Sequence, residues 1–599
     1  MQKWLTQRHH RWAAGLLLGG LLVRGAIALF LPPGFDEAYY YLYTQHLDWS
    51  YFDHPLLVAL STGLGPWITG EVSQFTIRLG TLLLHTGALW LLYLTSFWLF
   101  SSQAAVLTLA IVSLIPIFLV GFGVLTLPDA PLIFFWTATV YVAVREFWPR
   151  RGRDRRQEEA EARRQKPGAR RIVRCLSPVA SGRNQGAGGE EGSDRPHSYT
   201  PTYRLAIIGL LVGLACLSKY HGLILGMGLV GFCLTSSRYR VALRSPWMVL
   251  SFGLFLLAIT PILIWNVQHD WVSLRFQSGR AVPDRSYSLL DLLVTFLAGV
   301  AYLFPSFGFP LWGVSLKTAL SRLSQFGEVW KAKKDRREEA RGKIAEIDSP
   351  LRPTPYAPHP TPHVLLLWLS LPLMLGFTLM GGYRSILPTW AMPGFWSATL
   401  LLGWRAAGWQ CRFPRLVQRW LWGSGVAIAL CLLIAVLHVN LGILQKNSRY
   451  ALLGGFLSPT ADASIQLIDI HQLRAGFADS ASLRHEMQGI DYLFTNDLYL
   501  AGQVGMALAS LPHRPITCFE QDLRGFAFWS KNDGWVGKDG LLVTPAHKAE
   551  TTLAQYQGYF EKVQKVAEIP INRGGAIVQV IEIYRCDRLL KPYPRSYGI

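Results

Sequence analysis

Residues 34–57 read GFDEAYYYLYTQHLDWSYFDHPLL and follow directly on an apolar segment at residues 12–31. This stretch places an acidic pair, Asp36 and Glu37, at the expected exit of a membrane helix and then brings six Tyr and Trp residues. Between residues 32 and 75 there are five acidic residues and no Lys or Arg. Loops that face the anionic inner surface of a membrane are usually basic. The stretch therefore indicates a carboxylate site with aromatic residues suited to stacking on a sugar, held at the outer face of a membrane.

The composition of the whole chain is typical of a protein with many membrane spans. Of its 599 residues, 51% are hydrophobic and only 16% are charged, which excludes a disordered chain and an ordinary soluble domain. A helix needs about 20 residues to cross roughly 30 Å of hydrocarbon. We expect eleven such helices, near residues 12–31, 76–99, 104–122, 131–148, 204–218, 221–236, 247–266, 289–313, 363–380, 389–404 and 420–442.

The distribution of basic residues predicts the orientation of these helices. With a cytoplasmic N-terminus, the segments on the inner side carry 33 Lys and Arg and those on the outer side carry 5. Such a bias is the usual signature of topology in membrane proteins. It also accounts for the net charge of +20, because the basic residues lie in loops between spans. We therefore expect contacts with membrane lipids and no nucleic-acid partner.

Two domains are expected. Residues 1–445 form an all-α, multi-pass membrane domain, whose two long cytoplasmic loops are residues 149–203 and 314–362. Residues 446–599 no longer show the spanning pattern and form a small extracytoplasmic α/β domain. Strands are predicted at 491–495, 516–519, 540–544 and 576–586, and helices at 498–509 and 548–560.

The outer loops resemble glycosyltransferase family 39, which includes the protein O-mannosyltransferases and the lipid A aminoarabinose transferases. The resemblance lies in the acidic pair and in YFDHPLL at residues 51–57, where the family has a second Pro in place of Leu56. Further similar strings are CLSKYHGLILG at 216–226 and PILIWNVQHDWVSLRFQ at 261–277. The resemblance implies the C-type glycosyltransferase fold, and a bacterial member that moves a sugar from a polyprenyl-phosphate donor.

Catalysis is expected from the acidic pair. Transfer from a polyprenyl phosphate with inversion needs one base to activate the acceptor and cations to stabilise the departing phosphate. Asp36 is the first candidate for the base, and Glu37 is placed beside it, to raise its pKa or to bind the acceptor. The alternative is structural, since Asp36 could cap a short interfacial helix.

Substrate binding is expected from residues at the outer ends of the other spans. Asp129 precedes the fourth expected span, where it could equally cap that helix. Lys219 and Tyr220 match a Lys-Tyr pair of the family, and Lys219 either contacts the donor phosphate or anchors the span at the interface. The other candidates are Asp53, His54, His269 and Arg384. His269 could instead be a structural histidine.

The family usually shows a His-Trp-Pro string before its late spans, and this chain has Thr389-Trp390-Ala391 there, so any role of a His at 389 is absent. No cofactor is expected. A divalent-cation site formed by Asp53, His54 and Asp36 stays open as an alternative.

Together these features predict an integral-membrane, inverting glycosyltransferase of the cell envelope, of hexosyl or pentosyl type. It would act at the outer face of the membrane on a lipid, glycan or protein acceptor. The alternatives are a polyprenyl-lipid flippase or transporter and a non-catalytic membrane sensor. A transporter would show charges near the membrane midplane and repeated halves, whereas the charges here cluster at the outer ends of the spans.

Overall fold

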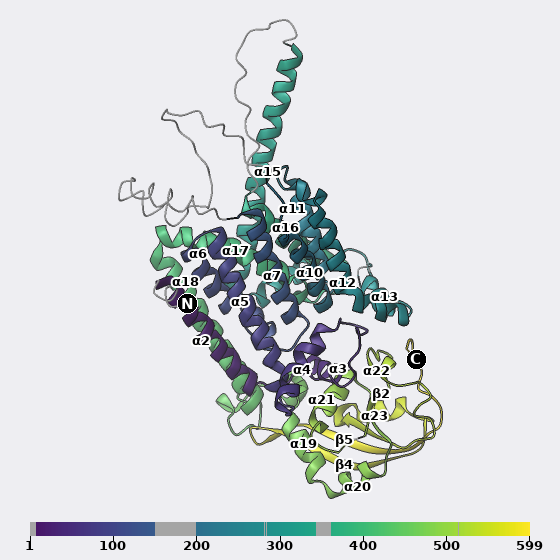
Figure 1. Ribbon diagram of the computed structural model, residues 1–599. Coiled ribbons are helices and arrows are strands. Elements are labelled where there is room, and N and C mark those ends of the chain that lie inside the picture. The colour runs from purple at the N-terminus through teal and green to yellow at the C-terminus, as the bar shows by residue number, and fades with distance from the viewer. Residues whose placement is uncertain are drawn as a thin grey trace.

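The computed structural model describes residues 8–149, 199–280, 282, 284–342, 361–512 and 514–598. A bundle of helices fills one half of the molecule, and a smaller domain built on a sheet packs under one end of it (Figure 1). Among the described residues, the sheet lies wholly after the last long helix of the bundle. The predicted division between residues 445 and 446 falls just past that helix, which ends at Leu441.

All eleven segments that were expected to span the membrane are helical. The helices at these positions are α2 (Arg8–Phe30), α5 (Leu79–Leu99), α6 (Ser102–Leu114), α7 (Asp129–Phe147), α10 (Arg204–Ser218), α11 (Gly222–Thr235), α12 (Pro246–Gln268), α14 (Leu289–Tyr302), α15 (Pro305–Gly342), α16 (Pro362–Met380), α17 (Met392–Arg412) and α18 (Pro414–Leu441). Short helices η1 (Thr76–Arg78), η2 (Ile117–Gly121), η3 (Arg240–Arg244) and η4 (Pro388–Ala391) join or extend them.

The number of membrane spans stays a prediction. Within the described residues, five helices are long and apolar enough to cross a bilayer, and a sixth span is formed if α14 and α15 count as one broken helix. These two helices meet at an angle of 114°. Several others, such as α6 and α10, are apolar but shorter than 18 residues, so they cross roughly 30 Å of hydrocarbon only with the help of their flanking segments.

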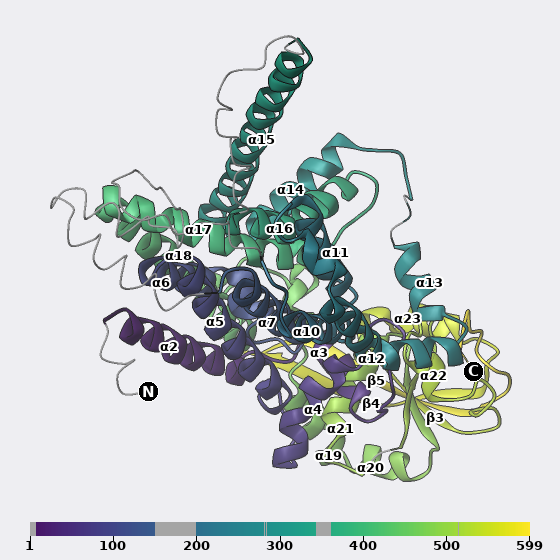
Figure 2. The ribbon, with the colours of Figure 1, turned by 45° about the horizontal axis from the view of Figure 1, so that its top comes forward.

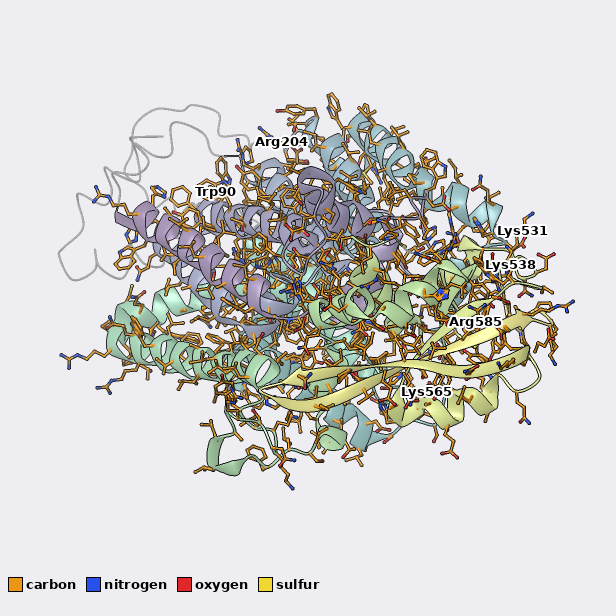
Figure 3. The ribbon with its side chains drawn as sticks, turned by 90° about the horizontal axis from the view of Figure 1, so that it is seen from below. Trp90, Arg204, Lys531, Lys538, Lys565 and Arg585 are labelled. Carbon is orange, nitrogen blue, oxygen red and sulfur yellow. The ribbon has the colours of Figure 1, made fainter. Side chains whose placement is uncertain are left out.

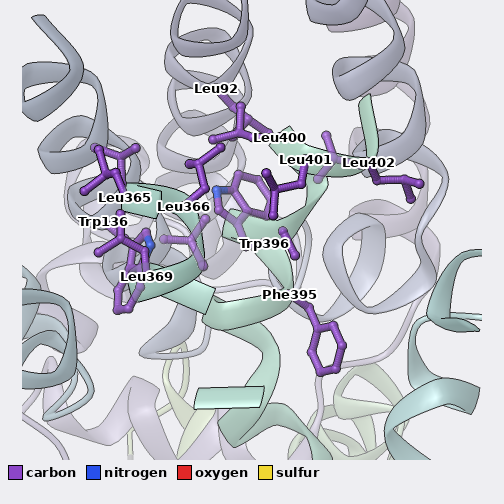
Figure 4. Close-up of a cluster of buried hydrophobic side chains, with 14 of the residues drawn as sticks. Leu92, Trp136, Leu365, Leu366, Leu369, Phe395, Trp396, Leu400, Leu401 and Leu402 are labelled. Carbon is purple, nitrogen blue, oxygen red and sulfur yellow. The ribbon is translucent and has the colours of Figure 1, made fainter. Parts of the chain in front are cut away.

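The core of the bundle is built from large apolar side chains of α5, α7, α16 and α17 (Figure 4). Trp396 of α17 lies at its centre and donates its indole N–H to the hydroxyl of Thr137 on α7, at 2.9 Å. Trp136 makes the reciprocal bond to Ser397, also at 2.9 Å. A buried indole N–H needs a partner in an apolar interior, and these two bonds fix α7 against α17.

Helix α15 departs from the bundle. It continues as one helix into the stretch that was expected to be the cytoplasmic loop 314–362, and it projects away from the other helices on the side opposite the sheet (Figure 1). Most of the predicted loop 149–203 and residues 343–360 of the predicted loop 314–362 lie outside the described residues.

The C-terminal domain is a mixed five-stranded sheet in the order β2-β1-β3-β5-β4. The strands are β1 (Tyr492–Thr495), β2 (Ile516–Cys518), β3 (Gly540–Pro545), β4 (Phe560–Arg573) and β5 (Ala576–Leu589). Strands β2, β1 and β3 run parallel, and β5 and β4 add antiparallel pairs. The helices are α19 (Ile470–Asp479), α20 (Ala481–Gln488), α21 (Leu498–Leu508), α22 (Phe526–Trp529) and α23 (Ala546–Gln555).

One predicted boundary in this domain was wrong. The helix expected at 548–560 ends at Gln555, and β4 begins at Phe560 and runs for 14 residues. Strand β4 is the edge of the sheet, so its outward positions carry charged residues and it tolerates Pro570. Its apolar residues do not alternate regularly with polar ones, and this is the reason that the sequence did not indicate a strand. In the view from below, Lys565 of β4 and Arg585 of β5 lie along this sheet (Figure 3).

The stretch quoted at the outset lies between the two domains. It forms α3 (Phe35–Tyr43), and it is followed by a loop and α4 (Leu57–Thr69). Helix α3 is sandwiched between the bundle and α21 (Figure 2). At the crossing, a Cβ on Gly502 of α21 would lie 2.6 Å from the backbone nitrogen of Tyr39, so only glycine allows the two helices to approach this closely. Tyr39, Leu42, Ala501 and Val504 belong to one buried apolar cluster.

Candidate active site

Glu37 is the centre of a buried ion pair. Its two carboxylate oxygens accept hydrogen bonds from Nε of Arg78 at 2.8 Å and from Nη2 of Arg78 at 2.6 Å. The backbone nitrogens of Gly34 and Thr126 each donate a further bond at 2.8 Å. Both Glu37 and Arg78 are buried. Four donors therefore occupy the predicted catalytic residue Glu37, and the pair joins α3 to the start of α5 and to the segment before α7.

Asp36 is free of such a pair and faces the C-terminal domain. The helix α3 begins at Phe35 with Gly34 as its N-cap, so the alternative of Asp36 as the cap residue was wrong. Burial raises the pKa of Asp36 to about 6, and the nearby carboxylates of Asp53 and Glu37 act in the same direction. The guanidinium of Arg524 and a hydrogen bond from Tyr499 oppose this rise. A carboxyl with a pKa close to neutrality is suited to general-base catalysis.

Asp53 connects the first outer loop to the C-terminal domain. Its Oδ1 accepts a hydrogen bond from the hydroxyl of Tyr43, and its Oδ2 lies 3.3 Å from Nη1 of Arg524. The carboxylate is buried, whereas the Arg524 side chain is 17% exposed. Burial opposes the charge of Arg524, yet Asp53, Tyr499 and Asp522 together raise the pKa of this guanidinium above its ordinary value. Arg524 is therefore a permanent cation next to both Asp36 and Asp53.

Lys219 and Asp129 form a second buried ion pair. The Nζ of Lys219 lies 2.8 Å from each carboxylate oxygen of Asp129. Asp129 is the first residue of α7, but its side chain makes no capping hydrogen bond. Its carboxylate forms the ion pair with Lys219 instead. Lys219 follows the last residue of α10 and is 7% exposed, so it does not extend to the interface as an anchor. The tight turn to α11 needs Gly222, whose Cβ would lie 2.3 Å from the backbone nitrogen of Cys216.

Two buried imidazoles at this place have unpartnered nitrogens. Within the described part of the chain, Nδ1 of His54 and Nε2 of His221 are buried and have no hydrogen-bond partner. Burial, together with the positive charges of Lys219, Arg280 and Arg524, lowers the pKa of His54 well below its usual value. His54 therefore stays neutral and presents one N–H donor. His221 lies within electrostatic range of Lys219 and His54 and stacks on Phe377, with ring centroids 5.3 Å apart.

Arg280 supplies a cation that no carboxylate neutralises directly. Its guanidinium lies 4.2 Å from the ring centroid of Phe276 and 5.7 Å from that of Trp390. Among the residues that the structure describes, it has no ion-pair or hydrogen-bond partner. Burial and the nearby charge of Arg524 lower the pKa of Arg280, which places the two guanidinium groups in the same region. An unpaired arginine beside a second one is a ready site for an anionic oxygen.

The remaining predicted residues lie around this centre. Tyr220 is hydrogen-bonded to the hydroxyl of Ser273 at 2.7 Å. His269 forms a hydrogen bond with the carbonyl of Trp265 at 2.8 Å and stacks on that ring, which fits the structural alternative for this histidine. Arg384 donates to the carbonyls of Gly279 and Val282 at 3.0 Å, so it supports the loop that carries Arg280.

The open question of a divalent cation concerns Asp36, Asp53 and His54. No group of three His, Cys, Asp or Glu side chains with the geometry to hold a metal ion occurs among the described residues. The carboxylate of Asp53 is engaged by Tyr43 and Arg524. The divalent-cation alternative stays a prediction.

Four members of the site were not predicted from sequence. Arg524 and Tyr499 come from the C-terminal domain, where no catalytic motif is visible. Arg280 is close to two other arginines in the sequence, and no motif distinguishes it from them. His221 follows the Lys-Tyr pair directly, and its position next to that pair is the one signal that could have indicated it.

An apolar recess adjoins the polar site. It is a small depression with space for about one water molecule, and it is lined by residues of α14, α15, α16, η4, α17 and the loop before η4, namely Thr295, Phe296, Gly299, Trp312, Phe377, Thr378, Ile386, Leu387, Pro388, Ala391 and Phe395. Phe377 is shared, because one part of its ring lines the recess and His221 stacks on it. Trp390 packs at the same boundary, 5.7 Å from Phe377. The recess and the cationic cluster are thus separated by a single layer of aromatic side chains.

Comparison with known proteins places this arrangement in context. A sequence profile described as dolichyl-phosphate-mannose-protein mannosyltransferase matches residues 53–153 and 199–265. No curated protein sequence matches the chain. The structure of ArnT from Cupriavidus metallidurans in the apo state superposes with a TM-score of 0.53 at 13% identity, covering 95% of this chain and 97% of ArnT. ArnT bound to undecaprenyl phosphate gives 0.53 at 12% identity, with the same coverage. This chain therefore has the ArnT fold, as the expected C-type fold implies.

Proposed function

We propose, from the resemblance to glycosyltransferase family 39 that the profile match and the shared ArnT fold confirm, that this chain is an inverting membrane glycosyltransferase. Its donor is a sugar linked to a polyprenyl phosphate. Its acceptor is a lipid, glycan or protein at the outer face of the membrane. The solved ArnT complex with undecaprenyl phosphate supports the class of donor lipid.

One observation carries the proposal. A carboxyl with a pKa of about 6, Asp36, lies in electrostatic contact with the cation Arg524, and Arg524 is close to the unpaired guanidinium of Arg280. A base beside an anion site is what a direct displacement of phosphate requires. Neither a passive sensor nor a flippase needs a near-neutral base at this position.

The proposed reaction is a single displacement. The carboxylate of Asp36 removes the proton from the acceptor nucleophile as that atom attacks the anomeric carbon of the sugar. The bond from this carbon to the phosphate oxygen breaks, and its electron pair leaves with the polyprenyl phosphate. Attack from the face opposite the leaving group inverts the anomeric configuration. The proton stays on Asp36 until solvent removes it.

Two cations and two imidazoles are assigned to the leaving phosphate. Arg280 and Arg524 stabilise its negative charge directly, since their guanidinium groups share one region of the site. Lys219 is neutralised by Asp129 and is assigned a structural role beside them. His54 and His221 offer the hydrogen-bonding nitrogens that have no protein partner. The neutral state of His54 suits a donor to an oxygen without the cost of burying another charge.

Glu37 is assigned a positioning role in place of the catalytic role predicted from sequence. Its ion pair with Arg78 holds the first turn of α3, which carries Asp36. The first isoprene units of the donor lipid are assigned to the apolar side of Phe377 and Trp390, where the small recess would have to widen to admit them.

The test is sugar transfer by the purified protein. The protein is reconstituted in nanodiscs with polyprenyl phosphates that carry radiolabelled hexoses, pentoses or amino sugars, and an envelope extract supplies acceptors. Wild-type protein should release polyprenyl phosphate and label a lipid, glycan or protein fraction, and the Asp36→Asn variant should not. Movement of the intact donor across the bilayer, with no cleavage, would support the flippase alternative instead. Mass spectrometry of envelope components with and without the protein then identifies the sugar and its acceptor.

A further inference from the structure

Residues 593–598 pack against the segment that carries Arg524. The guanidinium of Arg595 donates to the carbonyl oxygens of Ala527, at 3.3 Å, and Ser530, at 2.6 Å. Gly598 has a φ of +100° and a Cβ there would lie 2.2 Å from the carbonyl oxygen of Ala527. These contacts anchor the segment on both sides of Tyr597. They leave Tyr597 half-buried, in contact with Phe52 and with the residues preceding α22.

The hydroxyl of Tyr597 closes a ring of hydrogen bonds around Arg524. It accepts a bond from the backbone nitrogen of Arg524 at 3.0 Å and donates one to Oδ1 of Asp522 at 3.0 Å. The other oxygen of Asp522 lies 3.1 Å from Nε of Arg524. The backbone and the side chain of Arg524 are thus both fixed by one tyrosine and the carboxylate that it orients.

The ring of Tyr597 holds the opposite partner of the Arg524 ion pair. It stacks on Phe52 with ring centroids 4.5 Å apart and an interplanar angle of 8°. Phe52 immediately precedes Asp53, whose carboxylate lies 3.3 Å from Arg524. One side chain therefore contacts both sides of the junction between the first outer loop and the C-terminal domain.

Arg524 needs such support. Its φ is +41°, which is uncommon for any residue other than glycine and persists only where surrounding contacts hold it. A long arginine side chain also loses rotamer freedom when it is ordered at one place. The hydrogen bond that the Tyr597 hydroxyl accepts from Arg524 and the one that it donates to Asp522 offset these costs at the residue that faces Asp36.

We infer that Tyr597 is a positioning residue, which fixes the guanidinium of Arg524 in the candidate active site for the leaving phosphate of the donor. The inference rests on the proposed function for the role of Arg524, although the placement of Arg524 by Tyr597 is testable without it. Tyr597 does not contact the reacting atoms. It acts through the orientation of Arg524 and through the stacking that keeps Asp53 opposite to it.

The first experiment measures the order of Arg524 directly. The full-length protein in nanodiscs is treated with phenylglyoxal, and the modification of individual arginines is followed by peptide mass spectrometry. In the wild type, Arg524 should react slowly because it is ion-paired and 17% exposed. Tyr597→Phe keeps the stacking and removes both hydrogen bonds, and Tyr597→Leu removes both features. Both variants should raise the modification rate of Arg524 severalfold.

Two internal controls accompany this measurement. Arg585 is paired with Glu486, Asp539 and Asp587 in the same domain, and it does not contact Tyr597, so its modification rate should stay constant. The Tyr593→Phe variant changes a tyrosine of the same segment, whose hydroxyl bonds Gln555 instead, and Arg524 should remain protected in it. Equal rates for Arg524 in the wild type and in both Tyr597 variants would overturn the inference.

The second experiment links the placement to the reaction. Loss of the two hydrogen bonds of the Tyr597 hydroxyl should raise the donor KM of Tyr597→Phe about 10-fold, while the acceptor KM and the Tm stay close to the wild type. A purely structural role would instead lower the Tm and affect both substrates alike. If the wild type transfers no sugar from any polyprenyl phosphate, the proposed function fails, and the phenylglyoxal rates still decide whether Tyr597 positions Arg524.

Discussion

Lys219 and Asp129 neutralise each other inside the protein, with the ammonium 2.8 Å from both carboxylate oxygens. From sequence, each was a separate candidate for substrate binding at the end of its own helix. The structure joins them across the interface of α7 and α10, 90 residues apart in the chain. Neither side chain is an isolated charge. Each one offsets the free-energy cost of burying the other.

Lys219→Met should destabilise the protein strongly. Removing one partner of a buried ion pair leaves an uncompensated charge and costs about 3–5 kcal/mol. A detergent-solubilised variant should show a clearly lower Tm, measured by thermal unfolding of the purified protein. The double variant Lys219→Met with Asp129→Leu removes both charges and should recover most of the loss. A single variant with wild-type stability would contradict the ion pair as a structural element.

Asp36→Asn should abolish turnover without harming the fold. Loss of a general base lowers kcat by about 10²–10⁴-fold. Because burial already disfavours the ionised form of Asp36, the neutral Asn should leave the free energy of unfolding unchanged or slightly higher at pH 7. Activity and Tm are measured on the same preparation. Wild-type turnover in this variant would assign the base to another carboxylate.

The reaction should lose activity under mildly acidic conditions. The pKa of Asp36 is raised to about 6, and the base must be deprotonated, so kcat/KM should rise with pH through about 6 and level off above about 7. The free energy of unfolding should change with pH in the opposite direction, because a carboxyl whose pKa is raised on folding binds its proton more tightly in the folded state. This group therefore stabilises the fold as the pH falls from about 6 toward 4. A pH profile with no transition near 6 would argue against Asp36.

Arg280→Met should weaken the use of the donor. An ionic hydrogen bond is worth about 1.5–3 kcal/mol, so kcat/KM for the donor should fall about 10- to 150-fold. The Tm should change little, since the guanidinium has no ion-pair partner among the described residues. Arg275→Met is the matched control, because Arg275 is an exposed arginine on the neighbouring helix α13 (Val272–Gly279) and bonds only the carbonyl of Asp270. If both variants lowered kcat/KM for the donor equally, the loss would come from general electrostatic attraction and not from a specific contact of Arg280 with the phosphate.

The orientation of the chain is tested by labelling. A cysteine introduced at Asn496, in a background with Cys431→Ala to remove the exposed native thiol, should react with a membrane-impermeant reagent in intact cells whose outer envelope has been made permeable. A cysteine at Arg163, outside the described residues, should not react. The opposite pattern would reverse the predicted topology.

The sequence predicted the helices well, and the pairing of the charges in the candidate site poorly. Apolar length is a local property, so every expected span is helical. That the acidic pair marks the active site stays a prediction. Ion pairs depend on which helices pack together, and nothing local distinguishes Glu37, which binds Arg78, from Asp36, which remains free. Arg78 itself lies within a segment expected to span the membrane.

The contribution of the C-terminal domain to the site could not be predicted from the sequence, because it also depends on which elements pack together. Arg524 and Tyr499 have no motif around them, and they reach the site only because α21 packs on α3. Strand β4 was not predicted because charged residues and Pro570 interrupt its apolar pattern, as is common in an edge strand. The family resemblance indicated which loops to consider and left open which of their residues make contact.

The packing of α3 on the C-terminal domain also sets the order in which the molecule matures. Tyr39 and Gly525, which are hydrogen-bonded in the finished structure, are separated by 486 residues. At 5–20 residues per second, roughly 25–100 s of synthesis pass between their emergence. During that interval the C-terminal domain does not yet pack on the tyrosine-rich helix α3 and its carboxylates, although the neighbouring bundle can already insert into the membrane. Competence for chemistry should therefore lag well behind membrane integration, and a nascent chain stalled after α18 should be embedded and inert.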